Sequence, residues 1–275
     1  MRSRIALIAL SIALTGPSAV AQGIAEDSAS KPAPQGVQLD LSQAFHARSP
    51  WRLVVTEGPP TQDYGEGDAP GALTFCLRKG PAGPCVSAPI TPPPRTVPAG
   101  DPAWEPHYLF KAKLVYPRGQ KAAPYLLIVT GSLNSGDGDQ IIATQLVAYN
   151  AARDRFHRVY ADSTGRNNNE EIRYIEHGPL RGSVIDAEPQ DHRPYGYWIV
   201  VDSLTSAGAY RQVLRYQSAT RYNDGNPLAV IDSEMPNIER RLGLWKPGQP
   251  IPTPGLDGGK ACPNPMLRHT ELWCG

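Results

Sequence analysis

The sequence predicts an all-β protein: an antiparallel sandwich or a propeller-like arrangement of hairpins, with long Pro/Gly loops and one short C-terminal helix. The 275 residues include 29 prolines and 26 glycines, a composition typical of a β protein with many turns. Runs of strand length recur at a spacing of roughly 8–12 residues, separated by turn signals. Only residues 236–242, between a possible cap at Ser233 and a stop at Gly243, carry helix signals.

The N-terminus has the layout of a secretory signal peptide. Arg2 and Arg4 precede the apolar run 5–14, and the small residues of Ala19-Val20-Ala21 form a cleavage pattern. The apolar run is too short for a bilayer, which takes about 20 apolar residues. We therefore expect a signal peptide over residues 1–21.

The remaining chain divides into a leader and one domain. Residues 22–36 are small, polar and Pro-containing, which predicts a disordered leader. Residues 37–275 show no change of composition that would split them, so we expect a single β-rich domain with a Pro-rich, disulfide-pinned tail. No later run is apolar enough for a membrane helix, so no transmembrane segment is expected after cleavage.

The charge balance argues against nucleic acid as a partner. Residues 1–21 contain two of the 27 Lys and Arg residues, which leaves 25 against 26 Asp and Glu, a formal charge of −1. Proteins that bind nucleic acid usually show a basic excess or stripe. We therefore expect no nucleic-acid partner.

The first half of the domain contains four strand-like runs. Residues 51–58, 72–80 and 107–116 alternate apolar and polar side chains, whereas residues 124–132 are almost continuously apolar. A continuous apolar run is expected of a strand buried on both faces. Two Pro/Gly-rich loops, residues 59–71 and 87–106, separate these runs and are expected to stay outside the sheets.

The middle of the chain is predicted to form successive hairpins. Their arms are residues 140–149 and 156–162, residues 170–178 and 183–188, and residues 195–204 and 210–222, with a further strand over 227–234. The six-residue spacing of Tyr210, Tyr216 and Tyr222 puts these rings on one strand face. Such a face is either core or, if exposed, a platform for carbohydrate or protein.

Four cysteines, Cys76, Cys85, Cys262 and Cys274, predict two disulfides in an exported chain. Three pairings are possible, and we expect the local one, Cys76–Cys85 and Cys262–Cys274. Each bond would contribute about 2–3 kcal/mol because it closes a short loop. The alternative, a zinc site, needs closely spaced Cys or His pairs, and the sequence has none.

A polar turn, Asn134 to Gln140, joins two of the predicted strands. Calcium binds several oxygen ligands that converge from a flexible loop, and Asn134, Asp137 and Asp139 would supply three of them. The alternative is a turn without a ligand, in which Asn, Gly and Asp meet the demands of the backbone.

Two stretches, residues 134–142 and 223–230, resemble the FG-GAP/VCBS type of repeat. Both have an Asp/Asn/Gly-rich turn followed by an apolar run, as in that family. They depart from it where Ile141 and Leu228 occupy positions at which an acid is expected. The resemblance implies propeller blades whose turns bind calcium.

The most unusual string is STGRNNNEE, residues 163–171. Its amides and charges could bind a sugar or another polar ligand, and the predicted ligand-binding residues are Asn167, Asn168, Asn169 and Glu170. The alternative is structural, because Asn tolerates left-handed backbone conformations.

A third set of residues would suit a glycan-acting hydrolase. Asp186 and Glu188 are two apart on a predicted strand, and Glu176 lies on the opposite arm of the same hairpin. Paired carboxylates can serve as acid and base on a glycoside. Exposed acids on a strand more often form weak surface ion pairs.

The sequence lacks the motifs G-x-S-x-G, H-E-x-x-H and the phosphate-binding loop. We therefore expect an exported protein, periplasmic or secreted, that acts as a non-catalytic binding or structural module. The sequence identifies no partner, and a glycan or an envelope protein is the candidate; no cofactor is expected, with calcium as the alternative. The alternatives are the hydrolase and a calcium-stabilised scaffold.

Overall fold

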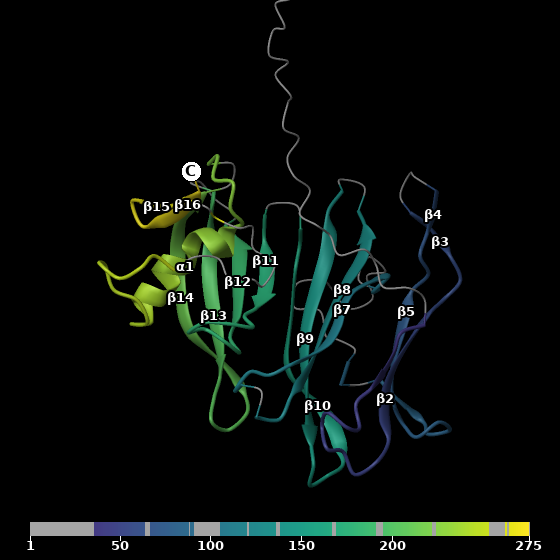
Figure 1. Cartoon of the computed structure of the whole chain (residues 1–275). Helices are drawn as coiled ribbons and strands as arrows, with labels where there is room; N and C mark the ends of the chain where they lie inside the picture. The colour runs from purple at the N-terminus through teal and green to yellow at the C-terminus, as the bar shows by residue number, and fades with distance from the viewer. Residues whose placement is uncertain are drawn as a thin grey trace, which may run out of the picture. The chain divides into compact units, whose positions relative to one another are not determined.

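The computed structural model describes residues 36–63, 67–87, 89–90, 105–119, 121–135, 138–166, 169–190, 195–221, 224–252, 262 and 264–274. The predicted signal peptide, and the predicted leader except for Gly36, lie outside these residues. The described chain is all-β, as predicted: it forms three four-stranded antiparallel sheets, two two-stranded sheets and one α-helix (Figure 1). That helix is not long and apolar enough to cross a membrane.

The N-terminal sheet has the strand order β1-β2-β5-β6. Its strands are β1 (Gln38–Asp40), β2 (Trp51–Glu57), β5 (Leu73–Lys79) and β6 (Cys85–Val86). One prediction fails here. The loop 59–71 was expected to stay outside the sheets, but it contains the two-stranded hairpin of β3 (Thr61–Asp63) and β4 (Gly67–Ala69). Its prolines flank these short strands and take no part in the pairing, so they do not prevent it.

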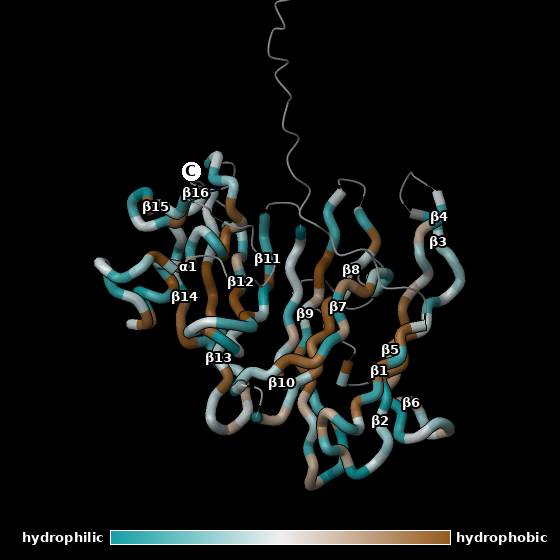
Figure 2. Tube along the Cα trace, in the orientation of Figure 1, coloured by the Kyte–Doolittle hydropathy of each residue, from teal (hydrophilic) through white to brown (hydrophobic). Residues whose placement is uncertain are grey.

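The middle sheet is a meander of β7 (Tyr108–Val115), β8 (Tyr125–Asn134), β9 (Gln140–Asn150) and β10 (Arg155–Thr164). The prediction that residues 124–132 are buried on both faces is confirmed. Leu126 and Ile128 of β8 join the core shared with the N-terminal sheet. Tyr125 and Leu127 point to the opposite face and join the core shared with the C-terminal sheet. Figure 2 shows hydrophobic residues along β8.

The C-terminal sheet is the meander of β11 (Glu171–Tyr174), β12 (Val184–Pro189), β13 (Gly196–Leu204) and β14 (Tyr210–Arg221). The prediction that its tyrosines share a face is wrong. The register of β13 and β14 shifts between Val201 and Asp202, and such a bulge reverses the faces beyond it. Tyr210 therefore packs toward the middle sheet, whereas Tyr216 packs toward the helix. Tyr222 lies outside the described residues.

The helix α1 (Val230–Arg241) begins six residues before its predicted start, and it replaces the strand predicted over residues 227–234. Val230, Ile231 and Ile238 have the spacing of one helix face, and they are buried against the C-terminal sheet. Pro236 lies inside the helix. The predicted start was wrong because the β-branched Val-Ile pair suggests a strand, and because a proline usually marks the first turn of a helix.

Both expected disulfides are present, Cys76–Cys85 and Cys262–Cys274, with Cα atoms 5.0 and 5.4 Å apart. The second holds the hairpin of β15 (Pro265–Arg268) and β16 (Glu271–Cys274). Two structural disulfides indicate that the chain matures in an oxidising compartment outside the cytosol.

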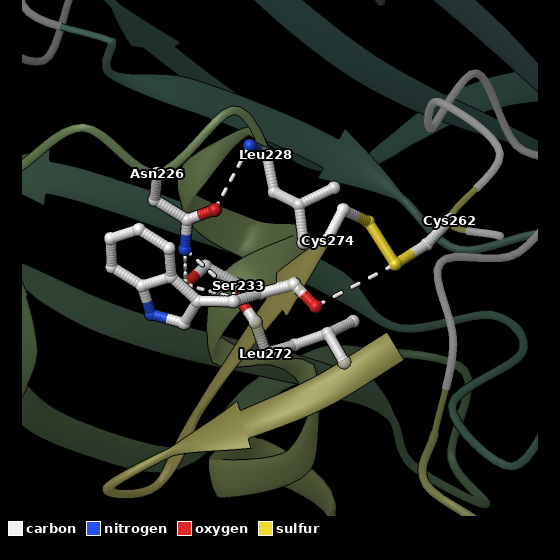
Figure 3. Close-up of a disulfide and its surroundings, with 7 residues drawn as sticks. Asn226, Leu228, Ser233, Cys262, Leu272 and Cys274 are labelled. Carbon is white, nitrogen blue, oxygen red and sulfur yellow. Dashed lines mark hydrogen bonds between the residues drawn. A yellow bond between two sulfur atoms is a disulfide. The ribbon is translucent and has the colours of Figure 1, made fainter. Parts of the chain in front are cut away.

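The side chain of Asn226 joins the C-terminal hairpin to the helix (Figure 3). Its Nδ2 donates to Ser233 Oγ at 2.8 Å and to the carbonyl oxygen of Leu272 at 2.9 Å. Its Oδ1 accepts from the backbone N–H of Leu228 at 3.1 Å. One amide thus fixes the entry to α1 and holds β16 against it.

Asp154, in the turn between β9 and β10, joins the N-terminal sheet to the middle sheet. Its carboxylate forms an ion pair with Lys79 and accepts hydrogen bonds from Ser49 Oγ at 2.6 Å, Tyr149 OH at 2.6 Å and Trp51 Nε1 at 2.9 Å. Lys79 first, then the three hydrogen-bond donors, hold the pKa of this carboxyl well below its usual range. A carboxyl whose pKa is lower in the folded chain stabilises the fold above the pKa of the unfolded chain.

We expect Asp154→Asn to lower the free energy of unfolding at pH 7. The difference between variant and wild type should shrink as the pH falls below about 4, where the unfolded carboxyl becomes protonated, and vanish once the folded carboxyl is protonated too. Urea unfolding at several pH values measures this. Asp68→Asn, at an exposed aspartate, is the control and should change stability little at any pH. An Asp154→Asn effect that does not depend on pH would contradict the assignment.

Candidate functional site

Two of the three sequence-predicted sites come together at one end of the middle sheet. The turn 134–140 joins β8 to β9, and the loop 165–170 joins β10 to β11. Asp139 Oδ1 accepts from the backbone N–H of Gln140 at 2.9 Å and from that of Arg166 at 2.8 Å. Arg166 Nη1 also donates to Gln140 Oε1 at 3.3 Å. We call the turn 134–140 and the loop 165–170 together the loop pair.

Two carboxylates of the loop pair approach each other over Gly165. A Cβ at this position would lie 2.2 Å from Glu170 Oε1 and 3.0 Å from Asp139 Oδ2. Because both distances start from one point, the two oxygens lie within about 5 Å of each other, a range in which like charges interact. Glycine is therefore the residue that allows both acids to sit here.

The polar residues of the turn also satisfy its backbone. The N–H and Oγ of Ser135 both donate to the carbonyl oxygen of Asp139, at 2.7 and 3.1 Å, and Gly138 has a positive φ of 83°. These contacts account for Ser, Asp and Gly without a ligand. Asp137 lies outside the described residues. Within the described ranges, no group of three His, Cys, Asp or Glu side chains is placed to hold a metal ion.

The asparagine string is only partly described, because Asn167 and Asn168 lie outside the described residues. Asn169 is exposed and has a positive φ of 56°, a conformation that Asn adopts more readily than most residues. Glu170 is half-buried, and its Oε2 lies 3.5 Å from Thr164 Oγ1. Asn169 thus has a backbone role, and its exposed amide is also available to a ligand.

The three acids of the hydrolase hypothesis have different surroundings. Glu176 forms an ion pair with Lys113 of β7, and Glu188 lies 3.6 Å from Arg215 of β14. Asp186 is buried on β12, opposite Ile172 of β11. Glu176 lies four residues further along that arm, so it is displaced from Asp186 by about 13 Å at the rise of a strand.

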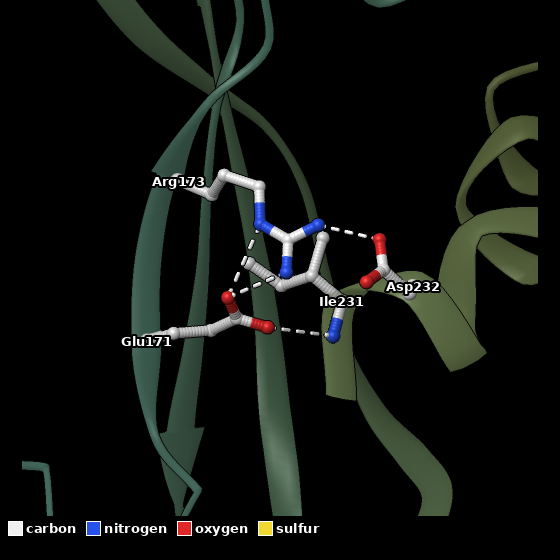
Figure 4. A network of polar contacts seen from close by, with 4 residues as sticks. All are labelled: Glu171, Arg173, Ile231 and Asp232. Carbon is white, nitrogen blue, oxygen red and sulfur yellow. Dashed lines mark hydrogen bonds and ion pairs between the residues drawn. The ribbon is translucent and has the colours of Figure 1, made fainter. Parts of the chain in front are cut away.

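Sequence analysis missed a partly buried charge network formed by Glu171, Arg173 and Asp232 (Figure 4). Glu171 Oε2 accepts from Arg173 Nη2 at 2.8 Å, and Arg173 Nη1 donates to Asp232 of α1. Glu171 Oε1 accepts from the backbone N–H of Ile231 at 3.1 Å. Burial disfavours the charge of Arg173, but Glu171 and Asp232 outweigh burial and raise its pKa.

The network gives α1 the cap that its own sequence lacks. The residue before the helix is Ala229, whose side chain makes no capping bond. Glu171 places a carboxylate at the helix N-terminus instead, where it satisfies a free N–H and interacts favourably with the helix dipole. The only signal for it in the sequence is a pair of charges, Glu171 and Arg173, on alternate residues of a strand.

A second buried carboxylate, Glu234, lies further along the helix. It accepts from Tyr216 OH at 2.6 Å, from Thr220 Oγ1 at 2.7 Å and from Asn237 Nδ2 at 3.1 Å. Burial and the neighbouring Glu234 raise the pKa of Tyr216 well above its ordinary value. These contacts lie inside the fold, and we assign them to its stability.

We compared the chain with family models, with curated proteins and with solved structures, and found no match. The resemblance of residues 134–142 and 223–230 to FG-GAP/VCBS repeats therefore stays a prediction. In the second of these turns, Asp224 Oδ1 accepts from the backbone N–H of Asn226 at 2.8 Å.

We expect Asp139→Ala to uncouple the loop pair. Two backbone N–H groups lose a charged acceptor, which should lower the free energy of unfolding by about 1–3 kcal/mol and speed hydrogen exchange at the Arg166 amide. Ser135→Ala is the matched control, because it removes a hydroxyl from the same turn but leaves Asp139 in place. Unchanged exchange at Arg166 in Asp139→Ala would contradict the coupling.

Proposed function

We propose that this protein is an exported, non-catalytic binding module that holds a polar ligand, a glycan in the first instance, on the loop pair. The observation that carries the proposal is the bond from the Arg166 backbone to Asp139, which joins two loops into one surface. Binding residues are commonly found on loops that a rigid scaffold positions.

The chemistry of the loop pair suits hydroxyl groups. Arg166 and Asn169 are exposed donors, and the half-buried Asp139 and Glu170 are acceptors. A sugar hydroxyl both donates and accepts, so it is matched by a surface that mixes amides, guanidinium and carboxylates. Because the backbone of Arg166 is already bonded to Asp139, little order would have to be gained on binding.

The proposed location is the periplasm or the extracellular medium. Two disulfides support a compartment outside the cytosol. The layout of residues 1–21 supports export by cleavage of a signal peptide.

Titration of purified residues 22–275 with a panel of neutral and acidic oligosaccharides tests the proposal, with heteronuclear NMR as the readout. We expect saturable shifts at the amides of residues 165–170. Arg166→Ala removes the guanidinium but keeps the backbone bond to Asp139, and Asn169→Gly removes the amide but keeps the positive φ. Each should weaken binding about tenfold.

Arg211→Ala, which removes an exposed arginine on β14, is the matched control and should bind like wild type. Saturable binding that maps elsewhere, or that survives both loop variants, would remove the loop pair as the site. If no oligosaccharide shifts the loop amides, a glycan is excluded as the ligand.

A calcium-stabilised scaffold is the second candidate, favoured by the approach of Asp139 and Glu170 over Gly165. A cation between two like charges would bind the folded chain only, and it would therefore raise the melting temperature by several degrees at saturation. Addition of calcium and then a chelator measures this, with Glu170→Gln as the variant that should lose the response. An unchanged melting temperature in wild type would exclude calcium.

A further inference from the structure

A pocket lies at the C-terminal end of the domain, between α1, the segment after it and the turn of the β15–β16 hairpin. It has a volume of about 280 Å³, and its polar lining includes Asn237, Arg240, Gln249, His269 and Thr270. Pro236, Trp245, Ile251 and Leu267 supply apolar walls. None of the three sequence-predicted sites includes these residues, and the pocket shares none with the loop pair.

Hydrogen bonds within the chain hold the walls of this pocket in place without a ligand. Asn237 Nδ2 donates to Thr270 Oγ1 at 3.2 Å and thereby ties the helix to the hairpin turn. Trp245 Nε1 donates to the carbonyl oxygen of Pro250 at 2.9 Å and fixes the segment after the helix. The pocket is thus formed before any ligand arrives, as most small-molecule sites are.

In the C-terminal part of the chain, the acidic side chains are buried and the basic side chains are exposed. Within the described residues 230–252 and 264–274, the four acids are buried, with exposed fractions of 9% or less: Asp232, Glu234, Glu239 and Glu271. The four Lys and Arg residues of the same ranges are all exposed: Arg240, Arg241, Lys246 and Arg268. Within these two ranges the exposed Asp, Glu, Lys and Arg side chains are therefore all cations, although the whole chain is nearly neutral.

Two of these buried acids are also weaker acids than an exposed glutamate. Burial raises the pKa of Glu239 and of Glu271 above the ordinary value for glutamate. Burial also keeps these carboxylates away from solutes at the surface. An anion in the pocket would therefore meet the exposed cations without competition from an exposed carboxylate of the same two ranges.

The histidine of the pocket occupies an unusual backbone position. His269, in the β15–β16 turn, has a φ of 61°. Among residues other than glycine, Asn, Asp and His adopt this left-handed conformation most readily. The turn thereby places the imidazole of His269 in the lining of the pocket.

We propose that this pocket binds a small carboxylate, with Arg240 as the principal ligand-binding residue and His269 as a second donor. A guanidinium pairs with a carboxylate through two parallel hydrogen bonds. The apolar walls suit a small neutral group attached to the carboxylate, such as the last residue of a peptide. The volume is close to the lower end of the range for ligand sites, which limits the ligand to about the size of one acylated amino acid.

The test is titration of ¹⁵N-labelled residues 22–275 with N-acetylalanine, followed through the tryptophan indole N–H signals. We expect a saturable shift of the Trp245 signal, which a Trp245→Phe variant assigns. The signal of Trp51, whose Nε1 donates to Asp154, should not move. N-acetylalaninamide, which has no carboxylate, should give no shift at the same concentration.

Variants separate recognition from general attraction of anions. Arg240→Ala should weaken binding about tenfold or more, because it removes a charged donor pair. Arg241→Ala is the matched control, because this neighbouring exposed arginine lies over the ring of Tyr216 and not in the pocket. His269→Asn keeps a residue that tolerates the positive φ and removes the imidazole, and it should weaken binding less than Arg240→Ala.

Two other anions define the ligand class. Glucuronate tests a sugar carboxylate, and binding tighter than that of N-acetylalanine would move the assignment from a peptide end to an acidic sugar and overturn the ligand proposed. If inorganic phosphate shifts the Trp245 signal and neither carboxylate does, the assignment of a carboxylate ligand would be overturned. If Arg240→Ala and Arg241→Ala weaken binding equally, the pocket is not the binding site. The absence of a saturable shift with any of the three anions would overturn the site as well.

Discussion

The carboxylate of Glu171 at the N-terminus of α1 is the interaction on which the C-terminal part of the fold depends. Removing an arginine and an aspartate from water is costly, and the cost is offset only when each charge is paired and hydrogen-bonded. Glu171 meets this condition by accepting from Arg173 and from the helix N–H of Ile231 at once. The helix can therefore bury Asp232 against the C-terminal sheet without leaving a charge unpaired.

Paired and hydrogen-bonded carboxylates also join the three large sheets to one another. The N-terminal and middle sheets share an apolar core and are also joined by the contacts of Asp154 with Ser49, Trp51 and Lys79. The middle and C-terminal sheets share a second core, and the ion pair of Lys113 and Glu176 links them. Hydrophobic burial supplies most of the stability of such layers. The polar contacts add direction, because a hydrogen-bonded carboxylate fixes the register of one layer on the next in a way that an apolar contact does not.

Local features of the sequence predicted most of the sheet structure. Hairpins form between segments that are close in the chain, so alternation and turn residues sufficed for the pairs β9–β10, β11–β12 and β13–β14. The continuous apolar run of β8 is also a local feature, and it sufficed to predict a strand buried on both faces. Both disulfides close loops between near neighbours in the sequence, and local pairing was the simplest of the three choices.

Features set by contacts between distant segments were not predictable in this way. The N–H of Arg166 meets Asp139, 27 residues earlier, and Glu171 caps a helix that begins some 60 residues later. No local pattern encodes either contact. The first turns of the predicted helix were missed because the Val-Ile pair there favours a strand, a preference that docking on the C-terminal sheet overrides. The tyrosine faces were missed because one unpaired residue in β14 shifts the register.

Native-state hydrogen exchange at the Ile231 amide tests the central claim most directly. If Glu171, Arg173 and Asp232 hold α1 to the C-terminal sheet as one unit, this amide should exchange only through the same large opening that exposes Ile199 in the centre of β13. The two amides should then show equal free energies of opening. Exchange at Ile231 by a small local opening, as fast as at the Gly208 amide in the turn before β14, would show that the helix is not held in this way.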